Sequence, residues 1–395
     1  RSVAVFLRSD LQGTAVELPC PFSKLAEQTQ PFFLDLRPEA DETQVRLQFG
    51  ERLNGALRLG GEGDRLTPRA AELRLHADTA EMPPEGRFRV TGRMERFSYT
   101  DWQAILRALS DDGSGAWPLP QVLDLEFREF EIGGRELAEL SLGVERQEAA
   151  WAIDVESADI LAGLTIPRGA SAAEPVEARV DYLRLDPFLE AAADDAPAVT
   201  RVDPGELPSL DVRLDRLDWA GRRFRDGRLM TSPVERGMAI HHLSLHTRHL
   251  DLKAQGSWKI GGQQEQRTEL TLQVEGESLA DGLDDLGLRN VLSGGEIRSA
   301  RAEVKWPDVP YHFDWAEATG QGSFDIRDGT LENVEPGAGR AAGLFSIAAL
   351  PRRLSLDFQD VFGKGYRFDE LTGRFTLREG SIFSQKLEMD GPSGQ

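Results

Sequence analysis

The sequence predicts a mainly β protein, a long and curved antiparallel sheet with a few short α-helices. Apolar and polar residues alternate over many short runs, which is typical of strands with one buried and one solvated face. Gly, Asp and Asn separate these runs at intervals of about ten residues, as in a meandering sheet. A longer motif also recurs along the chain, which favours an elongated body.

The predicted strands are the alternating runs. Each run places its apolar side chains on one side, so that half of every strand faces water. This explains a mean hydropathy of −0.40 together with 40% hydrophobic residues without invoking disorder. The clearest runs carry Val45, Leu47 and Phe49; Leu73 and Leu75; Phe88 and Val90; Leu270, Leu272 and Val274; and Phe324 and Ile326.

Four short helices are expected between the strands. Residues 101–109 place their apolar side chains on one helical face, with Asp101 as the N-cap. Residues 186–190 begin with Asp-Pro, a combination that favours a helix start. The other two candidates are residues 278–290 and 337–350.

A motif of strand, turn and strand recurs along the chain. Residues 124–137 align without gaps on residues 211–224, and a third copy lies at 357–373. In each copy the alternation slips by one residue in mid-strand. Such a slip predicts a β-bulge, and bulges bend sheets.

The charge balance excludes several classes of partner. The 395 residues include 67 acidic and 46 basic side chains, for a formal net charge of −21. Binding to nucleic acid and docking on an anionic membrane both need a positive surface, so we expect no nucleic-acid partner. The single cysteine, Cys20, excludes an internal disulfide and a cysteine-based zinc site.

No run approaches the roughly 18 apolar residues that read as a membrane-spanning helix, and Arg1 does not open a signal peptide. Because the chain starts at Arg and not at Met, we expect it to be part of a longer polypeptide.

The sequence offers no catalytic or cofactor motif. It has no Gly-x-Ser-x-Gly elbow, phosphate-binding loop or dinucleotide fingerprint. Acidic residues are too abundant for a hydrolytic carboxylate pair to stand out. The best metal candidate is the set His241, His242, His246 and His249, but mixed strand parity favours a solvated cluster instead. We therefore expect a non-enzymatic protein without cofactor or metal.

What remains is apolar surface arranged in a line. Roughly 25 strands at about 4.8 Å each would give a sheet on the order of 120 Å long. A large apolar face does not stay bare without a purpose. Either the sheet packs on itself as a sandwich, or it curls into a trough whose lining receives ligand chains.

Several motifs at both ends of the chain resemble the YhdP family. They lie at Trp306–Pro310, Pro336–Arg340, Gly343–Leu344, Leu350–Asp369 and Met389–Ser393 in the C-terminal third, and at Ser9–Gly13 and Leu18–Lys24 near the start. The sequence departs from the family pattern at Asp308 and Cys20, both in turn or surface contexts.

The resemblance implies a fold and a function. The family is grouped with the AsmA-like and TamB-like bridge proteins of Gram-negative envelopes, whose β-sheets form a U-shaped groove with an apolar interior. Its members are anchored in the inner membrane, cross the periplasm, and are implicated in moving phospholipid to the outer membrane and in its barrier integrity. The expected partners are phospholipid acyl chains, the inner membrane through an upstream anchor, and the outer membrane or its proteins near the C-terminus.

On this reading the chain is the periplasmic C-terminal part of such a protein. We expect one continuous body of four segments: a groove segment at 1–96, two groove modules with a short helix each at 97–180 and 181–277, and an AsmA-like region at 278–395.

Alternating apolar positions of the repeated strands are the predicted groove lining. They are Leu125, Phe127, Val212, Leu214, Phe324, Ile326, Leu356, Phe358, Phe375 and Leu377. Each of these is alternatively ordinary core beneath a helix. The helix expected at 337–350 is a candidate plug or gate at the groove end. Two other functions remain open: an envelope scaffold without a lipid conduit and, less favoured, a saccharide-binding or glycoside-hydrolysing β protein.

Overall fold

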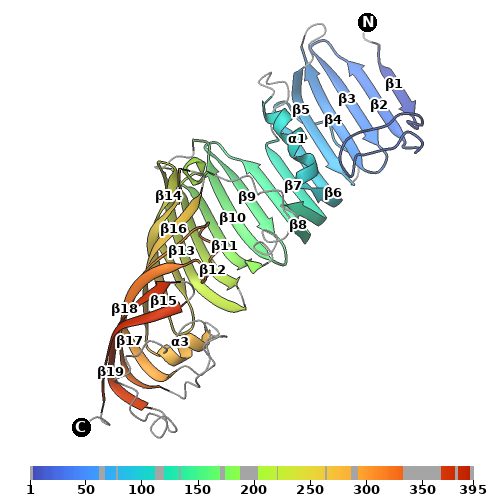
Figure 1. Cartoon of the computed structure of the whole chain (residues 1–395). Helices are drawn as coiled ribbons and strands as arrows, with labels where there is room; N and C mark the ends of the chain where they lie inside the picture. The colour runs from blue at the N-terminus through green and yellow to red at the C-terminus, as the bar shows by residue number, and fades with distance from the viewer. Residues whose placement is uncertain are drawn as a thin grey trace. The chain divides into compact units, whose positions relative to one another are not determined.

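The chain is mainly β, as predicted. The computed structural model describes residues 3–61, 67–76, 79–111, 120–132, 135–169, 174–186, 203–219, 221–262, 265–285, 292–331, 366–378 and 381–391. Within them lie twenty strands and two short α-helices (Figure 1). These elements fall into two compact units, one within Arg1–Arg168 and one within Gly169–Leu189 and Thr200–Gln395. The four predicted segments stay a prediction.

The first unit contains ten strands and helix α1 (Tyr99–Asp111). Its strands pair in chain order, antiparallel except for the parallel pairs β5–β6 and β6–β7. They are β1 (Val5–Ser9), β2 (Phe32–Pro38), β3 (Glu42–Phe49), β4 (Leu53–Gly60), β5 (Thr67–Leu75), β6 (Phe88–Ser98), β7 (Val122–Ile132), β8 (Arg135–Arg146), β9 (Ala150–Glu156) and β10 (Ile160–Pro167).

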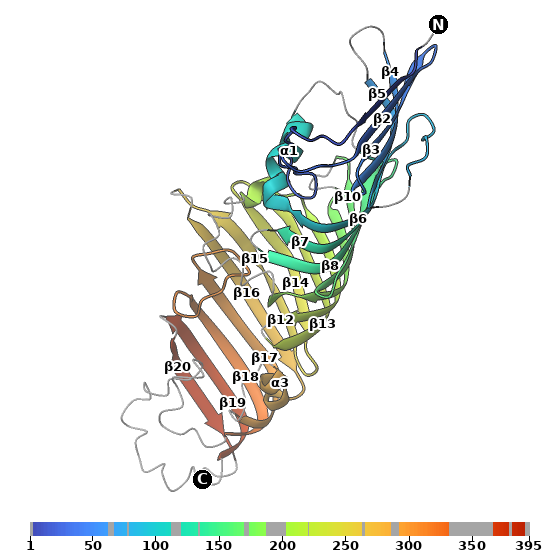
Figure 2. The ribbon, with the colours of Figure 1, turned by 90° about the vertical axis from the view of Figure 1, so that its right-hand side faces the viewer.

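The second unit contains ten strands, the 3₁₀ turn η1 (Pro204–Glu206) and helix α3 (Leu279–Asp285). Its strands also pair in chain order, and only β11–β12 is parallel. They are β11 (Val176–Arg184), β12 (Leu210–Trp219), β13 (Arg222–Val234), β14 (Gly237–His246), β15 (Asp251–Ile260), β16 (Gln266–Gly276), β17 (Leu292–Trp306), β18 (Thr319–Leu331), β19 (Tyr366–Arg378) and β20 (Ser381–Asp390). Figure 2 shows β17, β18 and β19 side by side, with α3 next to β17.

The expectation of antiparallel pairing throughout is wrong at three pairs, β5–β6, β6–β7 and β11–β12. Parallel neighbours need a connection that returns the chain to the rim where the previous strand began. Between β6 and β7, α1 lies in that connection. The sequence analysis identified the helix but did not draw this consequence from it.

Helix α1 confirms the helix predicted at 101–109, with a different cap. The Ser98 Oγ accepts a hydrogen bond from the Asp101 backbone N–H (3.2 Å), so Ser98 and not Asp101 is the N-cap. Asp101 lies in the first turn, where its charge suits the helix dipole. In the same way Ser278 caps α3, because its Oγ accepts from the Asp281 N–H (3.3 Å). The helix expected at 337–350 and nearly all of the one at 186–190 lie outside the described residues.

The mid-strand slip takes a different form from the expected bulge. Phe127 pairs with Leu140 and Glu129 with Ala138, so the register of β7 and β8 is unchanged. Arg128 and Glu139 lie between these pairs, and Glu139 has a positive φ of 51°. Beyond this point the alternation of side chains is reversed in both strands, so that the apolar side chains stay on one side of the sheet although their positions shift by one residue.

The equivalent slip in β12 and β13 has Asp226, with φ 49°, at the position that aligns with Glu139, and the register of this pair is also unchanged. On the other side of β13 its register with β14 does shift between Arg225 and Arg228, as at a bulge. The third sequence copy lies largely outside the described residues.

Ladder pairing gives each unit one apolar and one charged face. Residues paired across neighbouring strands share a face of the sheet. In the first unit one row crosses all ten strands: Leu7, Leu34, Leu47, Gly55, Leu73, Val90, Leu123, Val144, Ile153 and Leu164. In the second unit such a row is Ala178, Val212, Leu229, Leu243, Ala254, Leu272, Ala302, Gly322, Phe375 and Ser384.

The opposite face of the second unit is polar along the adjacent row. That row contains Arg179, Arg213, Arg228, Ser244, Lys253, Gln273, Arg301, Ser323, Arg374 and Lys386. We call the two sides of each unit its apolar face and its charged face.

Candidate functional site

The apolar faces are the candidate site. In each unit, the cross-strand row of apolar residues described above is only partly covered by other side chains. In the first unit's row every apolar side chain except Leu7 is half-buried, and Leu7 is exposed. In the second unit's row only Ala254 is buried. A second layer packed on these rows would bury them as a sandwich core does. Partial exposure along whole rows argues against a sandwich core at these positions.

Aromatic rings lie over glycines in the apolar face of the second unit. Phe375 covers its cross-strand partner Gly322, and Phe324 covers its partner Gly373. A Cβ on either glycine would collide with the ring. The two phenylalanine rings are stacked, with centroids 6.5 Å apart and planes at 28°. We call these two rings the aromatic floor of β18 and β19.

An aromatic cluster covers one end of the first unit's apolar face. Trp102 of α1 stacks on Phe97 (centroids 5.9 Å apart), and Phe97 contacts Phe127 and Phe130 at 5.5 and 5.4 Å. Phe22, from the segment between β1 and β2, meets Trp102 edge-on at 5.9 Å. The cluster leaves Phe127 only 3% exposed.

Helix α3 covers one end of the second unit's apolar face. Its Leu279 packs against the buried group of Ile326, Phe368 and Leu371. Gly282 lies against the Leu250 side chain, so closely that no Cβ would fit. This contact explains a glycine in the interior of a short helix, where it otherwise costs about 1 kcal/mol.

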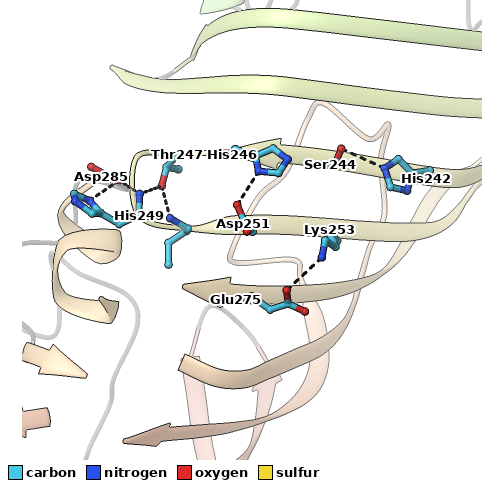
Figure 3. Close-up of polar contacts among 10 residues, drawn as sticks. His242, Ser244, His246, Thr247, His249, Asp251, Lys253, Glu275 and Asp285 are labelled. Carbon is cyan, nitrogen blue, oxygen red and sulfur yellow. Dashed lines mark hydrogen bonds and ion pairs between the residues drawn. The ribbon is translucent and has the colours of Figure 1, made fainter. Parts of the chain in front are cut away.

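A hydrogen-bonded latch fixes the C-terminal end of α3 (Figure 3). The Asp285 Oδ2 accepts from the His249 backbone N–H (3.0 Å) and lies 3.1 Å from the His249 Nδ1. The Thr247 Oγ1 accepts from the backbone N–H groups of His249 and Leu250 (3.2 and 2.9 Å). The turn between β14 and β15 is thereby shaped to receive the helix.

The turn after β17 covers the opposite end of the same strands. The Trp306 indole N–H donates to the Val309 carbonyl (3.0 Å), and its ring meets Phe313 edge-on at 5.1 Å. The Thr268 hydroxyl donates to the Asp308 carbonyl (2.6 Å). Trp306–Pro310, one of the motifs that carried the resemblance, therefore builds a turn here.

The structure divides the predicted lining residues into three groups. The half-buried ones are Val212, Leu214, Phe324 and Phe375. The buried ones are Leu125, Phe127, Ile326 and Leu377, which are 3–7% exposed. Leu356 and Phe358 lie outside the described residues. Phe324, Ile326, Phe375 and Leu377 lie together on β18 and β19, Val212 and Leu214 on β12, and Leu125 and Phe127 on β7.

The four clustered histidines have separate partners. The nearest partner of His246 is Asp251 (2.7 Å), that of His242 is Ser244 (3.2 Å), and that of His241 is Ser232 (2.6 Å). A bulge between Ile240 and Leu243 opposes His241 and His242 to a single residue of β15. Among the described residues no three His, Cys, Asp or Glu side chains are placed to hold a metal ion.

Ion pairs organise the charged face. In the second unit Asp218 accepts hydrogen bonds from Arg216 and, at 3.1 Å, from Arg223. These guanidinium groups, Arg216 first, hold the pKa of Asp218 below its usual range. The pairs keep the side that carries them hydrated, which leaves the other side for apolar contacts.

Residues that shape the apolar face without being large could not be identified from the sequence. Gly322 and Gly373 are examples, because a strand glycine taken alone reads as a weakness or a bulge. A usable signal was present in the alignment of Gly322–Gly329 with Gly373–Gly380, where each strand carries glycine and phenylalanine on one face. Trp102 was placed on the apolar face of its helix, but its partners Phe22 and Phe97 could not be foreseen.

Three comparisons relate the chain to known proteins. The family profile described as "YhdP protein" matches residues 2–395. The "Intermembrane phospholipid transporter YhdP" of Escherichia coli (strain K12) is 22% identical over 400 residues, covering 98% of this chain. The chain spans about 30% of the length of that relative. No solved structure matches the chain.

Within the described residues, none of the helices has the length and apolar character required to cross a membrane.

Proposed function

Because the chain belongs to the YhdP family, we propose that its apolar faces carry phospholipid acyl chains between the inner and outer membranes of a Gram-negative envelope. The strands curl these faces into a U-shaped groove, and the chain lies in the periplasm as part of an inner-membrane-anchored protein. Transport through the groove is non-enzymatic and supports the outer-membrane barrier.

The observation that carries the proposal is the apolar row of each unit, most of whose side chains are half-buried. Exposing two acyl chains to water costs about 0.8 kcal/mol per CH₂, so roughly 25 kcal/mol for about thirty methylenes. A lipid therefore does not cross water freely. A continuous apolar row lowers the cost of every intermediate position, and no catalytic group is needed.

The flat rings of Phe324 and Phe375 suit acyl chains in particular. A methylene chain gains dispersion contacts along a flat aromatic surface without a polar group to displace. Among the described residues, the covering elements α1, α3 and the turn after β17 lie at strand ends. In the first unit the neighbouring row of Val45, Leu57, Ala71 and Phe88 is buried, so the half-buried row beside it is the accessible part of that face.

A site-specific photocrosslinker tests this path. Benzoylphenylalanine at Phe375, in the chain expressed in a Gram-negative periplasm, is expected to yield phospholipid adducts by mass spectrometry. The matched control is Arg374, the neighbouring residue on the charged face and more exposed than Phe375. Equal adduct yields at both positions, or none at Phe375, would reject the apolar face as the path.

A charged substitution on the apolar face tests whether this path supports the outer-membrane barrier. Phe375→Glu is expected to weaken the outer-membrane barrier, whereas Arg374→Glu leaves it intact. A folded Phe375→Glu protein with full barrier function and no lipid adducts at neighbouring positions would favour the envelope scaffold instead.

A further inference from the structure

A pocket of about 860 Å³ lies in the first unit, away from the central apolar row. The segment between β1 and β2 forms most of its wall, from Val16 to Gln28. Arg52, His76, Glu95 and Asp101 complete it from the sheet and from α1. Nothing in the apolar path described above uses this pocket.

Two cations of the pocket are satisfied by carbonyl groups and not by carboxylates. Lys24 is 4% exposed, and its Nζ donates to the carbonyls of Thr14 (2.7 Å) and Leu25 (2.9 Å). The Arg52 Nη1 donates to the carbonyls of Pro21 (2.7 Å) and Ser23 (3.2 Å). In the part of the chain that the structure describes, neither side chain has an ion-pair partner within 4 Å.

Carbonyl oxygens satisfy donors but do not neutralise charge. A buried ammonium without a counterion is costly, so a site that keeps one gains when an anion enters. The chain as a whole carries a net charge of −21, so two cations that are held by carbonyl groups, without a direct ion pair among the described residues, are a local exception. Arg52 also has nitrogens beyond Nη1, and its planar fork matches the geometry of a phosphate.

The pocket also contains three carboxylates. Glu17 lies on the same segment as Lys24, and Glu95 forms an ion pair with Arg128 (3.3 Å). Glu95 belongs to β6 and Asp101 to α1, whereas Lys24 belongs to the segment between β1 and β2. Both signs of charge in one pocket suit a zwitterion, with a phosphate on the cations and an amine on the carboxylates.

The pocket adjoins the aromatic cluster of the apolar face. The indole N–H of Trp102 donates to the Cys20 carbonyl (3.1 Å) on the pocket wall. Phe22, on the same segment, packs on Trp102, which in turn stacks on Phe97 of the sheet. A ligand with a polar head and apolar chains would meet both environments within one unit.

We propose that this pocket binds the head group of a zwitterionic phospholipid, with its phosphate on Lys24 and Arg52. The inference rests on the proposed function and adds a place where the head group is held.

Cys20 supplies a probe that needs no mutation. It is the only cysteine of the chain, it is exposed, and it lines the pocket. We would measure the rate at which a disulfide reagent modifies its thiol. Short-chain phosphatidylethanolamine at about twice its Kd should slow the reaction about threefold by mass action. Diacylglycerol of the same chain length and inorganic phosphate at equal concentration should protect much less.

Two variants test whether the lipid that protects Cys20 is bound in this pocket. Gln28→Glu adds a negative charge to the pocket and keeps the side-chain oxygen that accepts from the Leu25 N–H (3.0 Å), so the fold is retained. Arg52→Gln removes one cation. With either substitution, phosphatidylethanolamine should no longer slow the modification of Cys20. Gln147→Glu, the same chemical change on an exposed residue outside the pocket, should leave it unchanged.

Three outcomes would overturn the proposal: equal protection by diacylglycerol, equal protection by inorganic phosphate alone, or protection unaffected by Gln28→Glu. Each is compatible with lipid adducts at Phe375, so failure of the head-group site and failure of the apolar path are separate results.

Discussion

The two units present the same kind of face but cover its ends differently. In the first unit α1 belongs to a parallel crossover and reaches the sheet through stacked rings, Trp102 on Phe97. In the second, α3 follows β16 of an antiparallel pair and is held by Gly282 on Leu250 and by Asp285 at His249. What the units share is the row of half-buried apolar residues. The face is thus the common feature, and the covers are local solutions at strand ends.

The largest expected effect separates the stabilities of the two units. Phe368 is fully buried on Gly329 in the second unit. Phe368→Ala should lower the free energy of unfolding of that unit by about 3–5 kcal/mol and leave the first unit's transition in place. Denaturant titration followed by limited proteolysis resolves the unfolding transitions of the two units. Phe383→Ala, at an exposed phenylalanine of β20, is the control. A matching loss in the first unit would mean that the units unfold as one.

The aromatic floor gives the next largest effect. Gly373→Ala should cost about 1–3 kcal/mol, because the new Cβ displaces the Phe324 ring. Gly143→Ala, in the first unit, meets only an ordinary contact with the Asp154 side chain and should change stability by about 0.5 kcal/mol or less. Chemical denaturation of both variants measures the difference. Equal costs would show that the ring–glycine contacts do not distinguish the second unit.

The latch on α3 should give a local effect. Asp285→Ala removes both contacts of the Asp285 carboxylate with His249, leaves the His249 N–H only the Thr247 Oγ1 as acceptor, and should weaken the docking of α3 by about 1–2 kcal/mol. Hydrogen exchange of the α3 amides should accelerate accordingly, while α1 is unaffected. Asp284→Ala changes an exposed neighbour and serves as the control. Unchanged hydrogen exchange of the α3 amides in the Asp285→Ala variant would show that the contact between Asp285 and His249 does not hold α3 in place.

The smallest effect concerns the charged face and depends on pH. The pKa of Asp218 is lowered in the folded protein by Arg216 and Arg223, so its contribution to stability is present above the unfolded value and is lost as the pH falls through the folded value. Asp218→Asn should therefore cost about 0.5 kcal/mol at neutral pH and less in strong acid. Unfolding free energies at both pH values test this. A cost that grows on acidification would contradict the assignment.

Alternation and helix periodicity were sufficient to predict the mainly β class, several of the strands and the two described helices. A period of two determines which side of a strand is apolar, so the face of Val212, Phe324 and Phe375 followed from spacing alone. Pairing partners did not, because they depend on how connections return the chain. The parallel pair β6–β7 is the clearest case, since the helix was predicted and its crossover was not.

The burial of individual positions was also beyond the sequence. Phe127 and Phe324 occupy similar alternating patterns, yet Phe127 is covered by an aromatic cluster and Phe324 is half-buried on a glycine. The difference comes from α1 and from the partner strand, which lie far from each phenylalanine in sequence. The Lys24 pocket was missed because backbone carbonyls, which carry no sequence signal, hold its cations.

The rings of Phe375 and Phe324 lie over Gly322 and Gly373, so apolar atoms fill the gaps that these glycines would otherwise leave in the apolar face. A hydrocarbon chain resting on such a floor meets nearly the same contacts after a shift of one carbon or of two. No length of chain and no position along the floor is then preferred, and friction against sliding is low. A surface of this kind binds by area and not by fit, so a mixture of acyl chains passes over it on equal terms.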